Sequence, residues 1–270
     1  MTTQRDDAPH EHDRGLSYDL PVLARRRMIR LLAGASLVPL VGCASEDEKS
    51  AASSAPSSSA ECAQIPEETA GPYPGDGSNG VNVLKESGVV RSDITKSFGD
   101  SAGGTAEGVP LTITLTVVDA ASGCGTPRQG AAVYLWHCDR EGRYSLYSEG
   151  VTDENYLRGV QETDDQGQVT FKSIFPACYQ GRWPHIHFEV YGSLADATAA
   201  TSITNTSQLA LPKDVCDTVY ATDGYSQSVT HLGQLSLESD NIFSDGHDQQ
   251  LATVKGSVEQ GYTATLTVPV

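Results

Sequence analysis

Two histidines separated by one residue carry the strongest chemical signal in this chain. His185 and His187 lie in the run His-Ile-His-Phe-Glu-Val, whose β-branched and aromatic residues favour a β-strand. Side chains two positions apart in a strand point to the same face, and their Cα atoms lie roughly 6.5 Å apart. Two imidazoles at that spacing can bind one metal ion. A bare pair also fits a half-buried strand without a metal, so further ligands are needed to support a metal site.

A phenol and a guanidinium lie just before this strand. Tyr179 and Arg182 belong to the loop that leads into it, and Pro184 suits a strand start, where no ladder N–H is required. Tyrosine is a weak ligand until it is ionised, because its ordinary pKa is about 10. A hard trivalent cation can displace that proton, as metals do with bound water. If a second tyrosine completes the set, two phenols and two imidazoles together favour Fe(III) over Zn(II).

The order of motifs around the histidines is also distinctive. Tyr-Leu-Arg-Gly-Val-Gln-Glu-Thr-Asp (156–164) is followed by Gly167, then by Ile-Phe-Pro, Tyr-x-Gly-Arg and His-x-His. This order resembles the intradiol ring-cleavage dioxygenases, the family of catechol and protocatechuate dioxygenases, and especially their secreted single-domain members. The resemblance extends over residues 61–246 and is most specific over 133–190.

The resemblance implies a cofactor, a reaction and a set of ligands. It implies one non-haem Fe(III) per chain, a catechol and O2 as substrates, and ring cleavage between the two hydroxylated carbons to a cis,cis-muconate. The implied iron ligands are Tyr156, Tyr179, His185 and His187. Tyr144 and Tyr147 lie nearby in the sequence and are the alternatives to Tyr156 as the first tyrosine.

Further residues receive roles from the same resemblance. Tyr179 would leave the metal when a catechol binds and would accept a proton. Arg182 would stabilise negative charge on the ring, and Gln208 would contact the same region. Tyr73, in a Gly-Pro-Tyr loop, would line the substrate cavity, and Trp183 would border it.

Apolar and alternating runs predict a mostly β domain. The expected strands are residues 111–118, 131–138, 168–173, 185–191, 208–211 and 262–268, with one short helix over 212–221. Short strands joined by turns indicate an antiparallel β-sandwich with long loops and little helix. The family resemblance implies the same all-β fold.

The N-terminal part has the composition of an export signal and a tether. Arg25 and Arg26 precede an apolar run over 31–41, and this run of about 11 residues is too short to span a bilayer. The arginines resemble a twin-arginine signal, with an ordinary secretion signal as the alternative. Leu-Val-Gly-Cys, ending at Cys43, resembles a bacterial lipobox. The predicted organisation is an export signal with lipobox (1–43), an Ala/Ser-rich tether (44–61) and a catalytic domain (62–270).

These features predict an exported lipoprotein on the outer face of the bacterial cytoplasmic membrane. The membrane would be contacted only through lipid on Cys43. The net charge of −17 argues against binding nucleic acid through a basic surface. Exported proteins can form disulfides, and the open pairings are Cys124 with Cys62 or Cys138, and Cys178 with Cys216. The sequence leaves the oligomeric state open.

Two other functions fit parts of the sequence. A zinc hydrolase could use the His-x-His pair, but it would need a third ligand, for which His137, His231 and His247 are available. A non-catalytic β-sandwich could bind a partner at the cell surface. Such a module has no chemical need for the tyrosines, the arginine and both histidines together.

Overall fold

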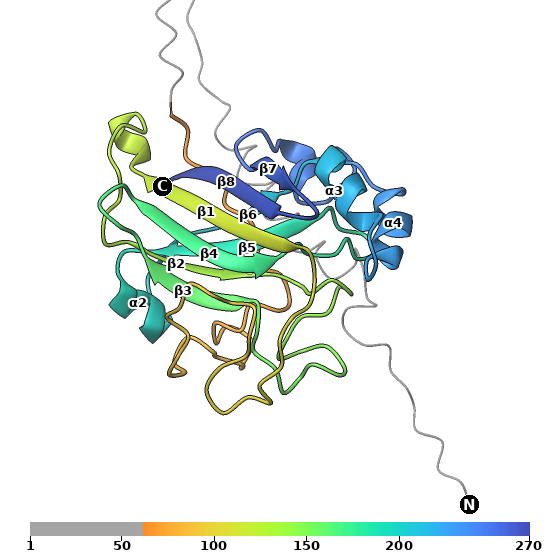
Figure 1. Cartoon of the computed structure of the whole chain (residues 1–270). Helices are drawn as coiled ribbons and strands as arrows, with labels where there is room; N and C mark the ends of the chain where they lie inside the picture. The colour runs from red at the N-terminus through yellow and green to blue at the C-terminus, as the bar shows by residue number, and fades with distance from the viewer. Residues whose placement is uncertain (1–61) are drawn as a thin grey trace, which may run out of the picture. The chain divides into compact units, whose positions relative to one another are not determined.

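Two four-stranded β-sheets form the core of residues 62–270, the part of the chain that the computed structural model describes (Figure 1). One sheet has the order β4-β1-β8-β7 and the other the order β3-β2-β5-β6. The strands of the first sheet are β1 (Pro110–Val118), β4 (Gln168–Ile174), β7 (Thr253–Ser257) and β8 (Gly261–Pro269). Those of the second are β2 (Ala132–Trp136), β3 (Arg158–Glu162), β5 (His185–Tyr191) and β6 (Ile203–Ala210).

The predicted all-β sandwich is confirmed. Neighbouring strands pair antiparallel, apart from β1 and β8, which run parallel. The predicted export signal (1–43) and tether (44–61) lie outside the described residues. Within residues 62–270, no helix is long and apolar enough to cross a bilayer.

Two strands were missed by the sequence pattern, β3 and β7. In β3 a glycine interrupts the apolar alternation, and this glycine has a packing reason. A Cβ on Gly159 would lie 2.5 Å from Cγ2 of Ile94, so only glycine lets the chain over residues 91–94 approach so closely. β7 is largely exposed, so it lacks the buried positions that would produce an apolar pattern.

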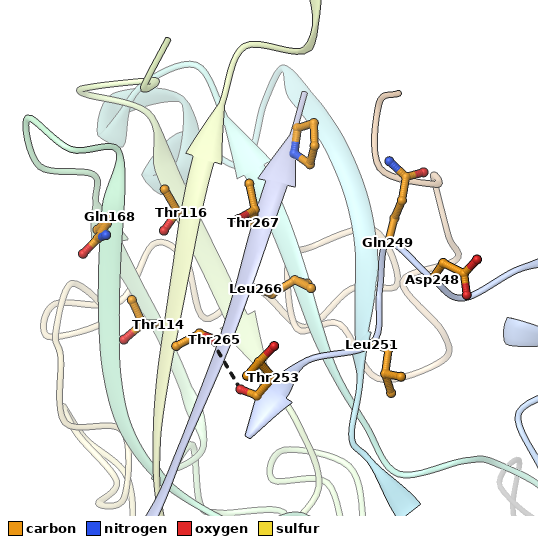
Figure 2. A pocket seen from close by; sticks show the side chains of 11 residues that line it. Thr114, Thr116, Gln168, Asp248, Gln249, Leu251, Thr253, Thr265, Leu266 and Thr267 are labelled. Carbon is orange, nitrogen blue, oxygen red and sulfur yellow. Dashed lines mark hydrogen bonds between the residues drawn. The ribbon is translucent and has the colours of Figure 1, made fainter. Parts of the chain in front are cut away.

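The strands bury apolar side chains on the face between the two sheets. In β1, Leu111, Ile113, Leu115 and Val117 are buried while the intervening threonines are more exposed, as the alternation predicted. The opposite face of that sheet is polar. Figure 2 shows Thr114, Thr116, Thr265 and Thr267 on it, around a shallow hollow of about 510 Å³.

Every residue of β5 is buried, which a strand with only one covered face cannot achieve. Ile186, Phe188 and Val190 pack between the sheets. The alternate residues, including both histidines, point to the outer face, where a second apolar cluster contains Tyr134 and Trp136 of β2. Long loops before β1 and between β2 and β3 cover this face (Figure 1). The histidines are therefore enclosed by loops rather than by the second sheet.

Short helices complete the fold: α2 (Leu194–Ala199), α3 (Lys213–Tyr220) and α4 (Ser226–Leu232), with single 3-10 turns at Ala120–Ser122 and Phe243–Asp245. The helix predicted over 212–221 is confirmed as α3. The other helices were not predicted.

One disulfide joins Cys62, the first described residue, to Cys124 in the β1–β2 connection. This is one of the two pairings left open for Cys124. The suggested bridge between Cys178 and Cys216 is not formed, because both are free buried thiols, as is Cys138.

Candidate metal centre

Two phenols and two imidazoles converge on the loop-covered face of β5. The Tyr144 and Tyr179 hydroxyl oxygens lie 3.4 Å apart, and the Tyr179 oxygen lies 3.2 Å from Nε2 of His185. Nε2 of His185 lies 3.1 Å from Nε2 of His187. The Tyr144 ring also packs edge-on against His187, with ring centroids 6.2 Å apart. The four polar atoms thus form one continuous series of close contacts.

Neighbouring groups fix both imidazoles. Nδ1 of His185 lies 2.5 Å from the carbonyl oxygen of Trp183, so this nitrogen carries the proton and Nε2 presents a lone pair. The His187 ring stacks on Trp136, with centroids 4.9 Å apart and planes 4° apart. These two residues are also direct partners across β2 and β5. His187 Nδ1 is buried without a hydrogen-bond partner among the described residues.

Burial keeps all four side chains of the cluster neutral. Burial holds the pKa of both imidazoles well below the usual value, so both are neutral at pH 7. Burial also raises the pKa of the Tyr144 and Tyr179 phenols. Nδ1 of His185 carries its ring proton, so its Nε2 lone pair faces Nε2 of His187 and the Tyr179 hydroxyl. Loss of the phenol proton would leave nitrogen and oxygen atoms that can bind a cation.

The geometry fits a single metal ion. Ligand atoms about 2.1 Å from one metal lie about 3.0–3.4 Å from their neighbours at octahedral or tetrahedral angles. The observed separations of 3.1–3.4 Å match this range. Phenolate oxygens are hard donors, so this set suits a trivalent cation better than a soft one.

The structure corrects the prediction for the first tyrosine, because Tyr156 is not in the cluster. Its hydroxyl donates to Oδ2 of Asp139 at 3.3 Å, and its ring packs in a separate cluster with Leu157 and Ile174. Leu157 has a positive φ of 57°, which places a sharp turn between Tyr156 and β3. Tyr144, one of the two predicted alternatives, lies beside Tyr179 in the cluster instead.

Asp139 holds the turn that delivers Tyr144, and sequence reasoning missed this residue. Its Oδ1 accepts from the backbone N–H groups of Glu141 and Arg143, and its Oδ2 pairs with the Arg143 side chain. Its backbone carbonyl accepts from the N–H of Ala177, in the segment before Tyr179. An Asp followed by Gly142 three residues later is a turn signal that could have indicated this role.

Comparison with known proteins identifies the family. The family model described as dioxygenase matches residues 89–231, just over half of the chain. The chain belongs to the intradiol ring-cleavage dioxygenases. Its fold is similar to that of an intradiol ring-cleavage dioxygenase from Tetranychus urticae, at 24% identity and a TM-score of 0.59, covering 77% of this chain and 94% of that one.

Two curated relatives match over a short segment. A chlorocatechol 1,2-dioxygenase from Rhodococcus opacus is 38% identical over 56 residues, which is 21% of this chain and 22% of the relative. A catechol 1,2-dioxygenase from a Pseudomonas species is 36% identical over 55 residues, 20% of this chain and 18% of the relative. The matched segment thus spans about a fifth of each.

In this dioxygenase, the side chains of Arg182 and Gln208 are in contact beside the cluster. The family resemblance implied that both residues act on the same region of the substrate. The guanidinium of Arg182 donates to Oε1 of Gln208 at 2.6 Å, and Gln208 is the direct β6 partner of His187. The Nε of Arg182 donates at 3.0 Å to Asp240, which is fully buried. Asp240 also accepts from three backbone N–H groups, at residues 183, 242 and 243. No motif predicted Asp240, which lies 58 residues from its arginine.

Tyr73 lies over the same face of the dioxygenase. Its ring packs on the rings of Tyr144 and Tyr147, with centroids 4.9 and 5.2 Å away. Two residues earlier, a Cβ on Gly71 would lie 3.4 Å from Cε1 of His187, and the φ of Gly71 is +71°. The glycine therefore brings this loop close to the ligand imidazole.

Trp183 borders the cluster only through its backbone carbonyl, which contacts His185, and its side chain does not take the predicted place at the substrate cavity. Its side chain is buried in the core between the sheets, and its Nε1 donates to the carbonyl oxygen of Leu211 at 2.9 Å. Arg182 and Trp183 lie in an irregular segment before β5, so the alternation of the strand does not set their directions.

The remaining histidines within residues 62–270 make hydrogen bonds to other groups. His137 uses both ring nitrogens on Cys138 and Ser173, while His231 and His247 contact backbone carbonyls of residues 178 and 243. Within residues 62–270, no three His, Cys, Asp or Glu side chains group together in a way that could hold a metal. The third ligand that a zinc hydrolase would need is therefore not among these residues.

Proposed function

We propose that this protein uses one Fe(III) to cleave catechols with O2 between the two hydroxylated carbons, giving cis,cis-muconates. The observation that supports it most is the convergence of Tyr144, Tyr179, His185 and His187, whose donor atoms lie 3.1–3.4 Å from their neighbours. The names of the two curated relatives support a catechol as the substrate class.

The four converging side chains would hold the iron, and the ferric ion would activate a chelated catechol toward O2. Tyr179 is the half-buried phenol of the pair, whereas Tyr144 is buried. Tyr179 is therefore the ligand that can swing away when a diol needs two positions. Its freed hydroxyl oxygen would then hold one of the catechol protons.

Arg182 would supply positive charge beside the bound ring. Its guanidinium is fixed by Asp240 on one side and Gln208 on the other, so it need not reorganise as charge develops. Gln208 is oriented in turn by donating to the carbonyl oxygen of Thr69 at 2.9 Å. The rings of Tyr73 and Tyr144 would form an apolar wall on the other side of the substrate.

The proposal predicts a coloured iron protein. The full chain produced with iron should bind about one equivalent and absorb visible light through phenolate-to-Fe(III) charge transfer. Added catechol should shift this absorption, and O2 should then convert catechol to cis,cis-muconate. Metal analysis and an absorption spectrum check the prediction. A colourless protein with stoichiometric zinc and no iron would contradict it.

We also propose that the protein is exported and anchored through lipid on Cys43, which lies outside the described residues. The Cys62–Cys124 disulfide supports an oxidising compartment. Labelled palmitate should be incorporated into the wild-type chain and not into Cys43→Ala, which should be released from the membrane fraction. Replacing Arg25 and Arg26 by lysine should block export. Membrane retention of Cys43→Ala equal to wild type would refute the anchor, and normal export of the lysine variant would refute the twin-arginine route.

A further inference from the structure

Arg158 is a buried cation that the proposed reaction does not use. Arg158 is 1% exposed, and its guanidinium donates to oxygen atoms of neutral groups. Removing a charge from water without a counter-charge is costly, so such a group needs a full set of hydrogen bonds. Its surroundings should therefore reveal what it holds in place.

All five N–H groups of the guanidinium have acceptors. Nε donates to Oγ of Ser145 at 3.0 Å, and one terminal nitrogen donates to the Ser145 carbonyl at 3.0 Å and the Tyr73 carbonyl at 2.9 Å. The other donates to the Pro74 carbonyl at 2.8 Å and the Tyr134 hydroxyl at 3.1 Å. One planar group thus joins two loops to strand β2.

These two loops carry the aromatic side chains at the metal centre. Ser145 follows Tyr144 directly, and the Tyr73 carbonyl belongs to the residue whose ring packs on Tyr144 at 4.9 Å. A shift of either loop would therefore move a phenol of the cluster or the wall beside it. On one loop the guanidinium donates to the carbonyl of Tyr73 itself, and on the other to that of Ser145, the residue directly after Tyr144.

Tyr147 closes the same pair of loops from the more exposed side. Its hydroxyl accepts from the N–H of Gly75 at 2.9 Å and donates to Oδ1 of Asn79 at 2.9 Å. The Arg158 guanidinium lies 5.5 Å from the centre of the Tyr147 ring. The Tyr73 loop is thus held between a buried cation and a surface phenol.

We propose that Arg158 is a positioning residue that fixes the Tyr144 phenol and the Tyr73 wall relative to the metal. The inference rests on the proposed iron site. A lysine cannot replace the arginine, because its three donors do not form a planar fork that reaches both loops. Groups that orient metal ligands typically change metal affinity or activity by about 10- to 100-fold when altered.

The test compares Arg158→Lys with wild type in the full chain. The variant should bind iron about 10- to 100-fold more weakly, and its tyrosinate resonance-Raman bands should shift. The KM for catechol should rise and kcat should fall, because the Tyr73 wall is displaced. In the metal-free protein, amides over residues 73–83 should exchange hydrogen about tenfold faster. Tyr147→Phe, which keeps Arg158 and its charge, should also speed amide hydrogen exchange over residues 73–83.

Arg91→Lys is the matched control. Arg91 also donates to backbone carbonyls, at residues 96, 155 and 158, but it contacts neither Tyr73 nor Ser145. The Arg91→Lys variant should have a lower free energy of unfolding but unchanged tyrosinate bands. A folded Arg158→Lys variant with wild-type bands, iron affinity and exchange would overturn the proposal. If the wild type binds no iron, the proposed function fails, and hydrogen exchange alone then decides whether Arg158 holds the loops.

Discussion

Tyr144→Phe is expected to abolish one of the two tyrosinate signals of the iron protein and to lower kcat/KM by more than about 100-fold. Altering a group that merely orients a metal ligand lowers affinity or activity by about 10- to 100-fold, and removing the ligand itself should cost more. The reason is geometric, since the Tyr144 hydroxyl lies 3.4 Å from that of Tyr179 and its ring contacts His187. Resonance Raman spectra of the catechol complex measure the effect directly. There, Tyr144 should be the phenolate that remains after Tyr179 leaves.

Tyr156→Phe provides the matched control, because it removes the same hydroxyl from a tyrosine 12 positions along the chain. This variant loses only the hydrogen bond to Asp139, at a cost of about 1 kcal/mol in the free energy of unfolding. It should keep both tyrosinate signals. The assignment of Tyr144 would be wrong if Tyr156→Phe lost a signal and Tyr144→Phe kept both.

Arg182→Gln is expected to lower kcat by about 10²- to 10³-fold, the usual effect of removing one fixed electrostatic donor. The iron content and both tyrosinate signals should stay at wild-type values, because the Arg182 side chain donates to Gln208 and Asp240 and its contact with Tyr179 is made by the backbone. The variant should still fold with reduced stability, because Asp240 keeps three backbone N–H donors.

Two further variants separate chemistry from folding. Arg182→Lys keeps a charge for Asp240 but cannot also reach Gln208, so its kcat should lie between those of Arg182→Gln and wild type. Arg140→Gln removes an arginine that pairs with the exposed Glu107, and it should leave kcat unchanged. Wild-type turnover in a folded, iron-loaded Arg182→Gln protein would exclude the role assigned to Arg182.

Local regularities explain what the sequence could predict. His185 and His187 share a face because side chains alternate in any strand, whatever the rest of the fold does. Tyr179 lies six positions before His185, which keeps the phenol within about 20 Å of the imidazoles, and the family motif implies that it joins them. The buried alternation of β1 likewise predicted its inward face, since the period of two is a property of the backbone.

Other features depended on packing between distant segments. Tyr144, Tyr147 and Tyr156 lie within 13 residues, and nothing local distinguishes them as ligands. A turn held by Asp139 directs Tyr144 to the cluster, and the positive φ of Leu157 sends Tyr156 elsewhere.

Short-range periodicity and contiguous motifs encode the sandwich class, the family and three of the four converging donors, so all of these could be predicted from the residues alone. The fourth donor and the partners Asp240 and Arg158 depend on packing between distant segments. Asp240 lies 58 residues from Arg182, and Arg158 lies 85 residues from Tyr73. Contacts over such separations are set by how loops pack on a completed sheet, and no local pattern of residue types records them.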